Sequence, residues 1–376
     1  MFISHPCVPP NCLGVAMVSR VLLVRGGRLA ENSGLGRAHQ AIESLLEKAL
    51  VPQWTKVGTI EHEQVTGLVQ RAVKRWYTHP RSVTKLSEST PADIIHITDQ
   101  EQAHLVPKNC PVPVIVTVHD LFHISPRKII GGDVTVSVGE QNPGLFRRRD
   151  LKMLKKGLER ADMIICISES TLMDVRRMFP GKKTALVRHQ IDTEYWSPFS
   201  NPKPRELLGD FDSESKMLVV TLGSNEERKR LNFAKKVISS LPDEVSKDIN
   251  TIHIGSEVKL TDDQLLAALQ SAEVLLFPSA SEGFGYPPAE AMAAGCPVIA
   301  SDLPAHNEII PSRCLLPATS TQDWVDEIVR IHSEWRAAGG VPRHPSEELM
   351  NHIEDLLSPK SQGASLAEAY SDALNK

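Results

Sequence analysis

Residues 277–308 read FPSASEGFGYPPAEAMAAGCPVIASDLPAHNE, and this stretch decides the fold. It begins at the end of a short apolar run, 274–277, that is typical of a buried strand, and its two adjacent prolines suit the first turn of a helix. We expect that helix at about residues 287–294, ended by a glycine and followed by a second buried strand at 297–300. Such a strand, turn and helix aim unpaired N–H groups and the positive end of a helix dipole at the carboxyl edge of a sheet, where phosphates bind.

Two carboxylates flank the glycine turn of this stretch. Glu282 precedes Gly283-Phe284-Gly285, and Glu290 lies eight positions after Glu282, in the expected helix. Two glutamates at this spacing would alone indicate only a solvated surface, but the whole run resembles the donor-site signature of GT-B glycosyltransferases of the family-4 kind. The resemblance implies that Glu282 contacts hydroxyls of the transferred sugar and that Glu290 contacts the ribose hydroxyls of the nucleotide. It also implies that the backbone of Gly283, Phe284 and Gly285 lies against the sugar and the phosphate.

Length and composition limit the class of protein. The chain has 376 residues, more than one hydrophobic core usually serves, and 41% of them are hydrophobic, so we expect a globular protein of two domains. No run approaches the roughly twenty apolar residues of a membrane-spanning helix, and residues 1–16 lack the basic start of a secretory signal. We therefore expect a cytoplasmic protein in which residues 1–16 are a disordered extension. The six cysteines lack paired metal-ligand spacing, and we expect buried, reduced thiols at Cys110, Cys166 and Cys296.

Charge is divided unevenly along the chain. Residues 1–196 carry a net charge of +7 and residues 197–376 a net charge of −11, which together give the overall −4. Much of the positive excess lies in residues 146–160, FRRRDLKMLKKGLER, where seven basic residues accompany two acidic ones. Such a helix could make a peripheral contact with anionic lipid at the inner face of a membrane, could hold an anionic acceptor, or could be a solvated helix face. The acidic second half disfavours nucleic acid as a partner.

Alternating strand and helix patterns predict the fold class α/β, with doubly wound parallel sheets. The expected strands are apolar runs without strict alternation, as burial on both faces requires. In the first half they are residues 21–24, 93–97, 114–118 and 163–167, separated by helical patterns such as 38–50 and 170–178. In the second half they are residues 217–222, 251–254, 274–277 and 298–300. The two halves are similar to the GT-B architecture, in which two Rossmann-like domains face a central cleft.

The domain boundaries follow from composition and from the resemblance. A stretch with three prolines, 196–204, indicates a linker. We expect an acceptor-side domain at residues 17–200 and a nucleotide-sugar donor-binding domain at residues 205–356. The resemblance implies that a last helix, at residues 357–376, crosses back to the first domain. Ligands of such proteins bind in the cleft at the carboxyl ends of the strands.

Two cations follow the strand expected at residues 217–222. Arg228 and Lys229 come shortly after Gly223, and cations at such a strand-to-helix turn can neutralise a diphosphate as the sugar leaves it. The resemblance assigns this role to Arg228 and Lys229 and places Gly223 in the donor site. Arg230 stands where the family often has an asparagine, so the pair of cations that binds the diphosphate could be shifted by one position, to Lys229 and Arg230. The alternative is a charge cluster exposed to solvent.

A glycine loop after the first strand completes the phosphate side of the expected site. Gly34 and Gly36 lie within residues 32–37, NSGLGR, which lacks the G-x-G-x-x-G spacing of dinucleotide-binding proteins. Glycine loops of this kind also occur in many other α/β proteins. The loop resembles the one that closes over the donor phosphates and the acceptor in family-4 enzymes, so the resemblance adds Gly34 and Gly36 to the donor-binding residues.

A histidine ends the strand expected at residues 114–118. The resemblance places His119 beside the donor sugar and makes it a catalytic residue that binds the sugar or the reacting oxygens by hydrogen bonds; the alternative is a histidine satisfied in the core. His189 stands where the family often has an asparagine, and we expect no consequence for the chemistry. Asp210 and Asp212 have the spacing of a metal-binding pair but lie in a polar linker, so we expect no metal.

The resemblance implies a retaining glycosyltransferase, which we expect to be metal-independent. It would move a hexose of the mannose or glucose type from a nucleoside-diphosphate sugar to a hydroxyl of a glycan, a lipid or a small molecule, without a cofactor. One alternative is a nucleotide-sugar epimerase of similar fold, which would form sugar isomers without a second substrate. Another is a non-catalytic scaffold subunit that has kept the GT-B fold.

Overall fold

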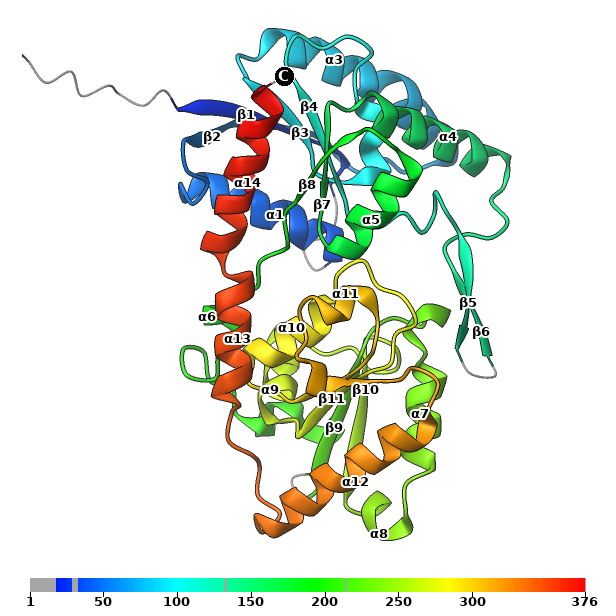
Figure 1. The fold of residues 1–376 in the computed structure, drawn as a ribbon, viewed down its shortest axis with the longest axis vertical. Helices are drawn as coiled ribbons and strands as arrows, with labels where there is room; N and C mark the ends of the chain where they lie inside the picture. The colour runs from blue at the N-terminus through cyan, green and yellow to red at the C-terminus, as the bar shows by residue number, and fades with distance from the viewer. Residues whose placement is uncertain (1–17, 29–32, 132–133, 214, 376) are drawn as a thin grey trace, which may run out of the picture.

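The protein consists of two α/β lobes. The structure is a computed structural model that describes residues 18–28, 33–131, 134–213 and 215–375. The lobes lie one above the other along the long axis, and each surrounds a parallel sheet with helices (Figure 1). The predicted α/β class with two parallel sheets is therefore confirmed. The expectation for residues 1–16 lies outside the described residues.

The upper lobe contains six parallel strands in the order β2-β1-β3-β4-β7-β8. They are β1 (Ser19–Gly27), β2 (Trp54–His62), β3 (Ile94–Ile97), β4 (Val114–Val118), β7 (Met163–Cys166) and β8 (Lys183–Leu186). The lower lobe contains five parallel strands in the order β10-β9-β11-β12-β13. They are β9 (Met217–Leu222), β10 (Ile249–Ile254), β11 (Val274–Phe277), β12 (Val298–Ser301) and β13 (Leu315–Leu316). An antiparallel hairpin extends from the upper lobe beside the lower lobe (Figure 1); its strands are β5 (Arg127–Gly131) and β6 (Val134–Val138).

Helices cover both sheets and connect the lobes. The helices of the upper lobe are α1 (Gly34–Glu47), α2 (Leu68–Val73), α3 (His79–Ser89), α4 (Leu145–Arg160) and α5 (Glu169–Met178), with a π-helical turn η1 (Lys74–Thr78) and a 3-10 helix η2 (Gln100–Leu105). The connecting segment contains α6 (Thr193–Trp196) and the 3-10 helix η3 (Arg205–Phe211). The remaining elements are η4 (Glu227–Lys229), α7 (Leu231–Ser239), α8 (Asp243–Ser246), α9 (Asp262–Ser271), α10 (Tyr286–Ala293), α11 (Pro304–Asn307), η5 (Ser312–Cys314), α12 (Thr321–Ala337), α13 (Glu347–Leu357) and α14 (Pro359–Leu374).

Burial explains which strands the sequence predicts. β4 and β11 are buried along their whole length and have the predicted bounds, because central parallel strands are covered on both faces and consist of apolar residues. β2 and β8 lie at the two edges of the upper sheet and were not predicted. β2 is buried only at Trp54 and Ile60, and β8 has no buried residue, so neither gives a continuous apolar pattern.

The first helix begins earlier than the predicted residues 38–50. Ser33 caps α1, since its hydroxyl accepts a hydrogen bond from the backbone N–H of Gly36 at 3.1 Å. The prediction that Gly34 and Gly36 lie in a loop is therefore wrong, because the cap brings both glycines into the first turn of the helix.

The chain crosses between the lobes twice. Val187 packs in the upper core and Ile191 in the lower core, so the first crossing comes before the proline-rich stretch 196–204. The second crossing is at Ser358, and α14 then lies against the upper sheet (Figure 1). Tyr370 of α14 is fully buried there, and its hydroxyl lies 2.8 Å from Nδ1 of His96. The chain end thereby becomes part of the upper core.

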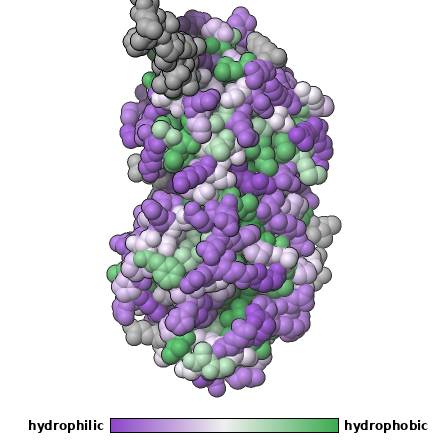
Figure 2. All heavy atoms as spheres, turned by 60° about the vertical axis from the view of Figure 1, so that its left-hand side comes forward, coloured by the Kyte–Doolittle hydropathy of each residue, from purple (hydrophilic) through white to green (hydrophobic). Residues whose placement is uncertain are grey.

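The four described cysteines are free thiols. Cys166 and Cys296 are buried as expected, and burial raises the pKa of Cys166 to about 12, whereas Cys110 and Cys314 are only partly buried. Figure 2 shows one face of the molecule, where hydrophilic residues surround small hydrophobic groups and the lobes meet at a waist. Within the described ranges, no helix is long and apolar enough to cross a membrane.

Candidate active site

The glycine turn predicted to bind phosphate follows β11 and faces the upper lobe. Gly285 has a φ of +116°, in the region that favours glycine, and Phe284 anchors the turn in the lower core. The two prolines that follow Tyr286 in α10 have no N–H group. Backbone donors to a bound phosphate must therefore come from residues 283–286, ahead of the prolines.

Glu282 forms two ion pairs with the cations that follow β9. Its Oε1 lies 2.7 Å from Nζ of Lys229, and its Oε2 lies 2.9 Å from Nη1 of Arg228. The Glu282 side chain is only 8% exposed. Burial alone would raise the pKa of Glu282, but Lys229 and Arg228 outweigh it and lower this pKa to about 2. The carboxylate therefore stays charged at neutral pH.

The geometry separates Arg230 from the other two cations. Arg230 has a left-handed φ of +53°, and its guanidinium lies 4.2 Å from the centre of the Phe233 ring and donates to the carbonyl of Ala318. Arg228 and Lys229 instead lie in the short helix η4 and reach Glu282. Gly223 lies behind this pair, since a Cβ at Gly223 would be 3.5 Å from the Lys229 side chain. The structure thus brings the predicted residues Gly223, Arg228, Lys229 and Glu282 together.

Glu290 is paired with a residue that the sequence reasoning did not include in the site. Its side chain is 4% exposed and forms an ion pair with Nη1 of Arg37 from the upper lobe. The Arg37 guanidinium also lies 5.3 Å from the centre of the Tyr286 ring. Burial raises the pKa of Glu290, and the charge of Arg37 opposes this only in part. The one signal for Arg37 in the sequence is its position directly after Gly36.

The two lobes touch at the glycine turn. A Cβ added to Gly283 would lie 2.2 Å from the carbonyl oxygen of His119, so only glycine allows this approach. A second contact is made by Glu308 of the lower lobe, which accepts hydrogen bonds from the N–H groups of Glu169 and Ser170 at 2.8 and 2.9 Å. These N–H groups open α5, where a carboxylate also interacts favourably with the helix dipole. The glycine turn and Glu308 of the lower lobe are therefore docked on the upper lobe.

The His119 ring is held by protein groups at both nitrogens. Nε2 lies 3.0 Å from the carbonyl oxygen of Thr98, and Nδ1 lies 3.1 Å from Nε2 of His189. The residue is 7% exposed. His119 stands at the cleft, as predicted for the end of β4, but in this arrangement its carbonyl, and not its ring, meets the donor turn. Its action on the sugar stays a prediction.

The remaining predicted positions lie at the edges of the site. Gly36 is buried and Gly34 is open, since a Cβ at Gly34 would meet no atom within 4 Å. Both precede Arg37 and place its helix beside the cleft. Asp212 is held by Arg205 at 2.6 Å, which gives this carboxylate a structural partner. Among the described residues, no group of three or more His, Cys, Asp or Glu side chains is placed to hold a metal ion.

Two family models match the chain. The one described as Glycosyltransferase Family 4 matches residues 42–195, and the one described as Glycosyl transferases group 1 matches residues 216–334. The MMP alpha-(1->4)-mannosyltransferase of Mycolicibacterium hassiacum is 49% identical over 120 residues, which are 31% of this chain and 28% of that protein. The O-antigen chain mannosyltransferase RfbU of Salmonella typhimurium is 34% identical over 104 residues, 27% of this chain and 26% of that protein. The chain thus spans less than a third of the length of these two relatives.

Solved structures share the fold over nearly the whole chain. Sucrose-phosphate synthase from Thermosynechococcus elongatus has a TM-score of 0.65 at 16% identity, with 94% of this chain and 98% of that chain covered. Anabaena Alr3699/HepE in complex with UDP and glucose has a TM-score of 0.67 at 11% identity, with 94% and 100% covered. At these identities the likeness shows the fold alone, and that fold is GT-B.

We expect Gly283→Ala to separate the lobes, because the new Cβ would lie 2.2 Å from the His119 carbonyl oxygen and neither backbone can yield as a flexible side chain does. Overpacking of this kind costs about 1–3 kcal/mol. The variant should have a lower Tm and a larger radius of gyration in small-angle X-ray scattering. Gly144→Ala is the matched control, since its Cβ would meet no atom within 4 Å. A Gly283→Ala variant with the wild-type radius and Tm would contradict the close approach.

Proposed function

This chain belongs to the GT-B glycosyltransferases of the family-4, group 1 kind, and we propose that it moves a hexose from a nucleoside-diphosphate sugar to an acceptor hydroxyl, with retention at the anomeric carbon. The observation that carries the proposal is the unit of Glu282, Arg228 and Lys229 beside the glycine turn. A buried carboxylate between two cations is a site in which both partners can bind a substrate: the cations can bind a diphosphate, and the carboxylate can bind sugar hydroxyls.

Donor binding exchanges the partners of these groups. The diphosphate takes the place of Glu282 at Arg228 and Lys229, and the released carboxylate accepts hydrogen bonds from the sugar. Glu290 likewise exchanges Arg37 for the ribose hydroxyls. Arg228 and Lys229 thereby keep an anionic partner in both states, each carboxylate keeps hydrogen-bond partners, and the released Arg37 side chain, which is 39% exposed, can be solvated.

In the transfer step, the protein has to stabilise the leaving diphosphate rather than supply a nucleophile. The bond from the anomeric carbon to the diphosphate oxygen breaks, the bond to the acceptor oxygen forms on the same face, and a phosphate oxygen takes the acceptor proton. Arg228, Lys229 and the N–H groups of residues 283–286 stabilise the charge that develops on the diphosphate. The protein needs no metal for this step in the proposed mechanism.

Mannose is the sugar that the relatives favour, since RfbU and the Mycolicibacterium protein are both named as mannosyltransferases. Glucose is the runner-up, because HepE is solved with UDP-glucose. The acceptor is a hydroxyl compound that enters from the side of the upper lobe, such as a glycan, a lipid or a small molecule.

The proposal predicts that one nucleotide sugar raises the Tm of the purified protein in a panel of UDP-, GDP- and ADP-sugars, and that Glu290→Gln weakens this shift because ribose binding needs the carboxylate.

Lys229→Ala should retain donor binding and lower kcat by about a hundredfold, as expected for a lost leaving-group cation. Lys235→Ala is the control, because Lys235 is half exposed and pairs with Glu257 outside the cleft. Sugar isomers formed without an acceptor would indicate an epimerase, and no shift with any nucleotide sugar would favour a scaffold.

Donor binding should weaken on acidification. Burial raises the pKa of Glu290 above its ordinary value of 4.5, so this carboxylate takes up a proton at a higher pH than an exposed glutamate and then binds the ribose hydroxyls less well. In the ligand-free protein Glu282, with a pKa of about 2, stays charged over the same range. Titration calorimetry should show the Kd of the nucleotide sugar rising as the pH falls toward 4.5 in the wild-type protein, but not in Glu290→Gln. An equally steep rise in the variant would contradict this assignment.

We also propose that the start of α4 contacts a membrane surface. Leu145 and Phe146 are 83% and 76% exposed, and Phe146 stacks on Trp76 with ring centres 6.0 Å apart. Arg148, Arg149 and Lys152 are exposed beside them. Exposed apolar side chains flanked by cations fit the interface of a bilayer with anionic lipid.

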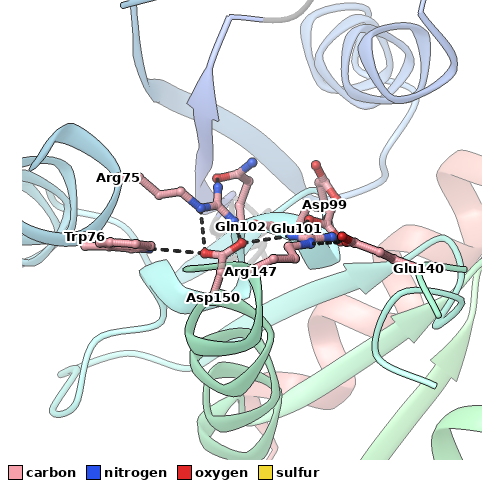
Figure 3. Close-up of polar contacts among 8 residues, drawn as sticks. All are labelled: Arg75, Trp76, Asp99, Glu101, Gln102, Glu140, Arg147 and Asp150. Carbon is pink, nitrogen blue, oxygen red and sulfur yellow. Dashed lines mark hydrogen bonds and ion pairs between the residues drawn. The ribbon is translucent and has the colours of Figure 1, made fainter. Parts of the chain in front are cut away.

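Part of the basic run has a structural role instead. Arg147 turns toward Glu101, Glu140 and Asp150, and Asp150 also binds Arg75 and Trp76 (Figure 3). This polar cluster joins α4 to η1 and η2. It fixes the angle at which the exposed end of α4 leaves the upper lobe, and it removes Arg147 from the charge available to a membrane.

The membrane proposal predicts that the protein co-sediments with vesicles that contain phosphatidylglycerol, less with pure phosphatidylcholine, and less at high salt. Leu145→Ser with Phe146→Ser should abolish most of this binding. Phe199→Ser is the control, because Phe199 is 63% exposed in the proline-rich stretch 196–204, outside α4. Equal loss in the control, or binding unaffected by the double variant, would contradict the proposed surface.

A further inference from the structure

His189 is a buried residue between the two lobes that the proposed mechanism does not use. It follows β8, where the chain crosses to the lower lobe, and it is only 1% exposed. On one side its ring lies 5.0 Å from the His119 ring, and on the other it lies 5.0 Å from the Tyr286 ring and 5.3 Å from the Phe284 ring. His189 therefore contacts both the histidine at the end of β4 and the aromatic residues on either side of Gly285.

The hydrogen bonds of this pair define the proton positions. A carbonyl oxygen can only accept, so Nε2 of His119, 3.0 Å from the Thr98 oxygen, carries a proton. Nδ1 of neutral His119 is then an acceptor, and Nε2 of His189, 3.1 Å away, must be its donor. The remaining nitrogen, Nδ1 of His189, is unprotonated, and it is buried with no hydrogen-bond partner among the described residues. With a single proton on His119, this is the arrangement that satisfies all of these contacts.

Burial keeps His189 neutral. It lowers the pKa of His189 well below the ordinary value, and the neighbouring His119 lowers it further. A neutral imidazole with Nδ1 unprotonated has its single proton on Nε2, which is the donor that His119 needs.

We propose that His189 is a positioning residue for the transfer step: its Nε2–H holds His119 in one tautomer and orientation, and its ring holds that histidine against the donor turn. The inference rests on the proposed function. The backbone carbonyl of His119 abuts Gly283, so the ring that His189 orients belongs to a residue at the wall of the proposed donor site. Phe284 and Tyr286, on either side of Gly285, contact the other side of the His189 ring.

Two substitutions distinguish the role of the N–H group of His189 from that of its aromatic ring. His189→Phe keeps an aromatic ring between His119 and Tyr286 but has no N–H group, whereas His189→Gln keeps an N–H donor at the position of Nε2 but has no ring. We expect His189→Phe to lower kcat about tenfold while the donor KM stays within about twofold, which corresponds to the loss of one hydrogen bond. His189→Gln should recover most of that loss. In a His119→Ala background, His189→Phe should cause no further loss, since it acts only through His119.

A measurement that does not depend on activity tests the same hydrogen bond. In 15N-labelled wild-type protein, a scalar coupling across the hydrogen bond should connect Nε2 of His189 with Nδ1 of His119, and it should vanish in His189→Phe while the Tm is retained. A missing coupling, equal losses of kcat in the Phe and Gln variants, or full additivity with His119→Ala would each overturn the inference. A wild-type protein that shows the coupling but transfers no sugar would overturn the proposed function instead, and with it the catalytic meaning of the pair.

Discussion

The double ion pair of Glu282 with Arg228 and Lys229 is the interaction on which the rest of the site depends. A buried carboxylate is costly unless cations compensate it, and here two cations hold its pKa near 2. The pair joins the end of β9 to the turn after β11, so neighbouring strands of one sheet define the floor of the cleft. Because the same cations suit a diphosphate, the ligand-free protein keeps its anion site filled by its own side chain. Substrate binding is then an exchange of partners, in which the diphosphate enters a site whose cations are already in place.

Contacts between the two lobes constrain this part of the site further. Arg37 on Glu290, the carbonyl of His119 on Gly283 and Glu308 on α5 are all contacts between the lobes. Each involves a residue of the stretch 277–308, so the segment that we propose binds the donor is also the one that docks the upper lobe. We infer that donor binding and lobe closure are coupled, since a ligand that displaces Arg37 from Glu290 changes one of the contacts that hold the lobes together.

Much of the fold follows from the sequence, for a physical reason. Central strands such as β4, β9 and β11 are predominantly apolar because helices cover both faces of each sheet, and their predicted bounds agree with the structure. The edge strands β2 and β8 carry exposed polar residues, and their pairing is decided by the sheet and not by their own pattern. Gly34 and Gly36 were expected in a loop because glycine favours turns, but the cap at Ser33 outweighs that preference and brings both into the first turn of α1.

The residues of the candidate site likewise divide into those that the sequence predicts and those that it does not. The carboxylates, the turn and the cations could be predicted because they follow strand ends, whereas Arg37 and His189 acquire partners only when the lobes dock; for His189 the one signal was its departure from the family's usual asparagine.

A crystal structure with the nucleotide sugar that stabilises the protein tests the central claim most directly. The account predicts diphosphate oxygens on Nζ of Lys229 and Nη1 of Arg228, the Glu282 carboxylate on sugar hydroxyls, and the ribose on Glu290. A nucleotide sugar bound elsewhere, with the ion pairs of Glu282 intact, would contradict it.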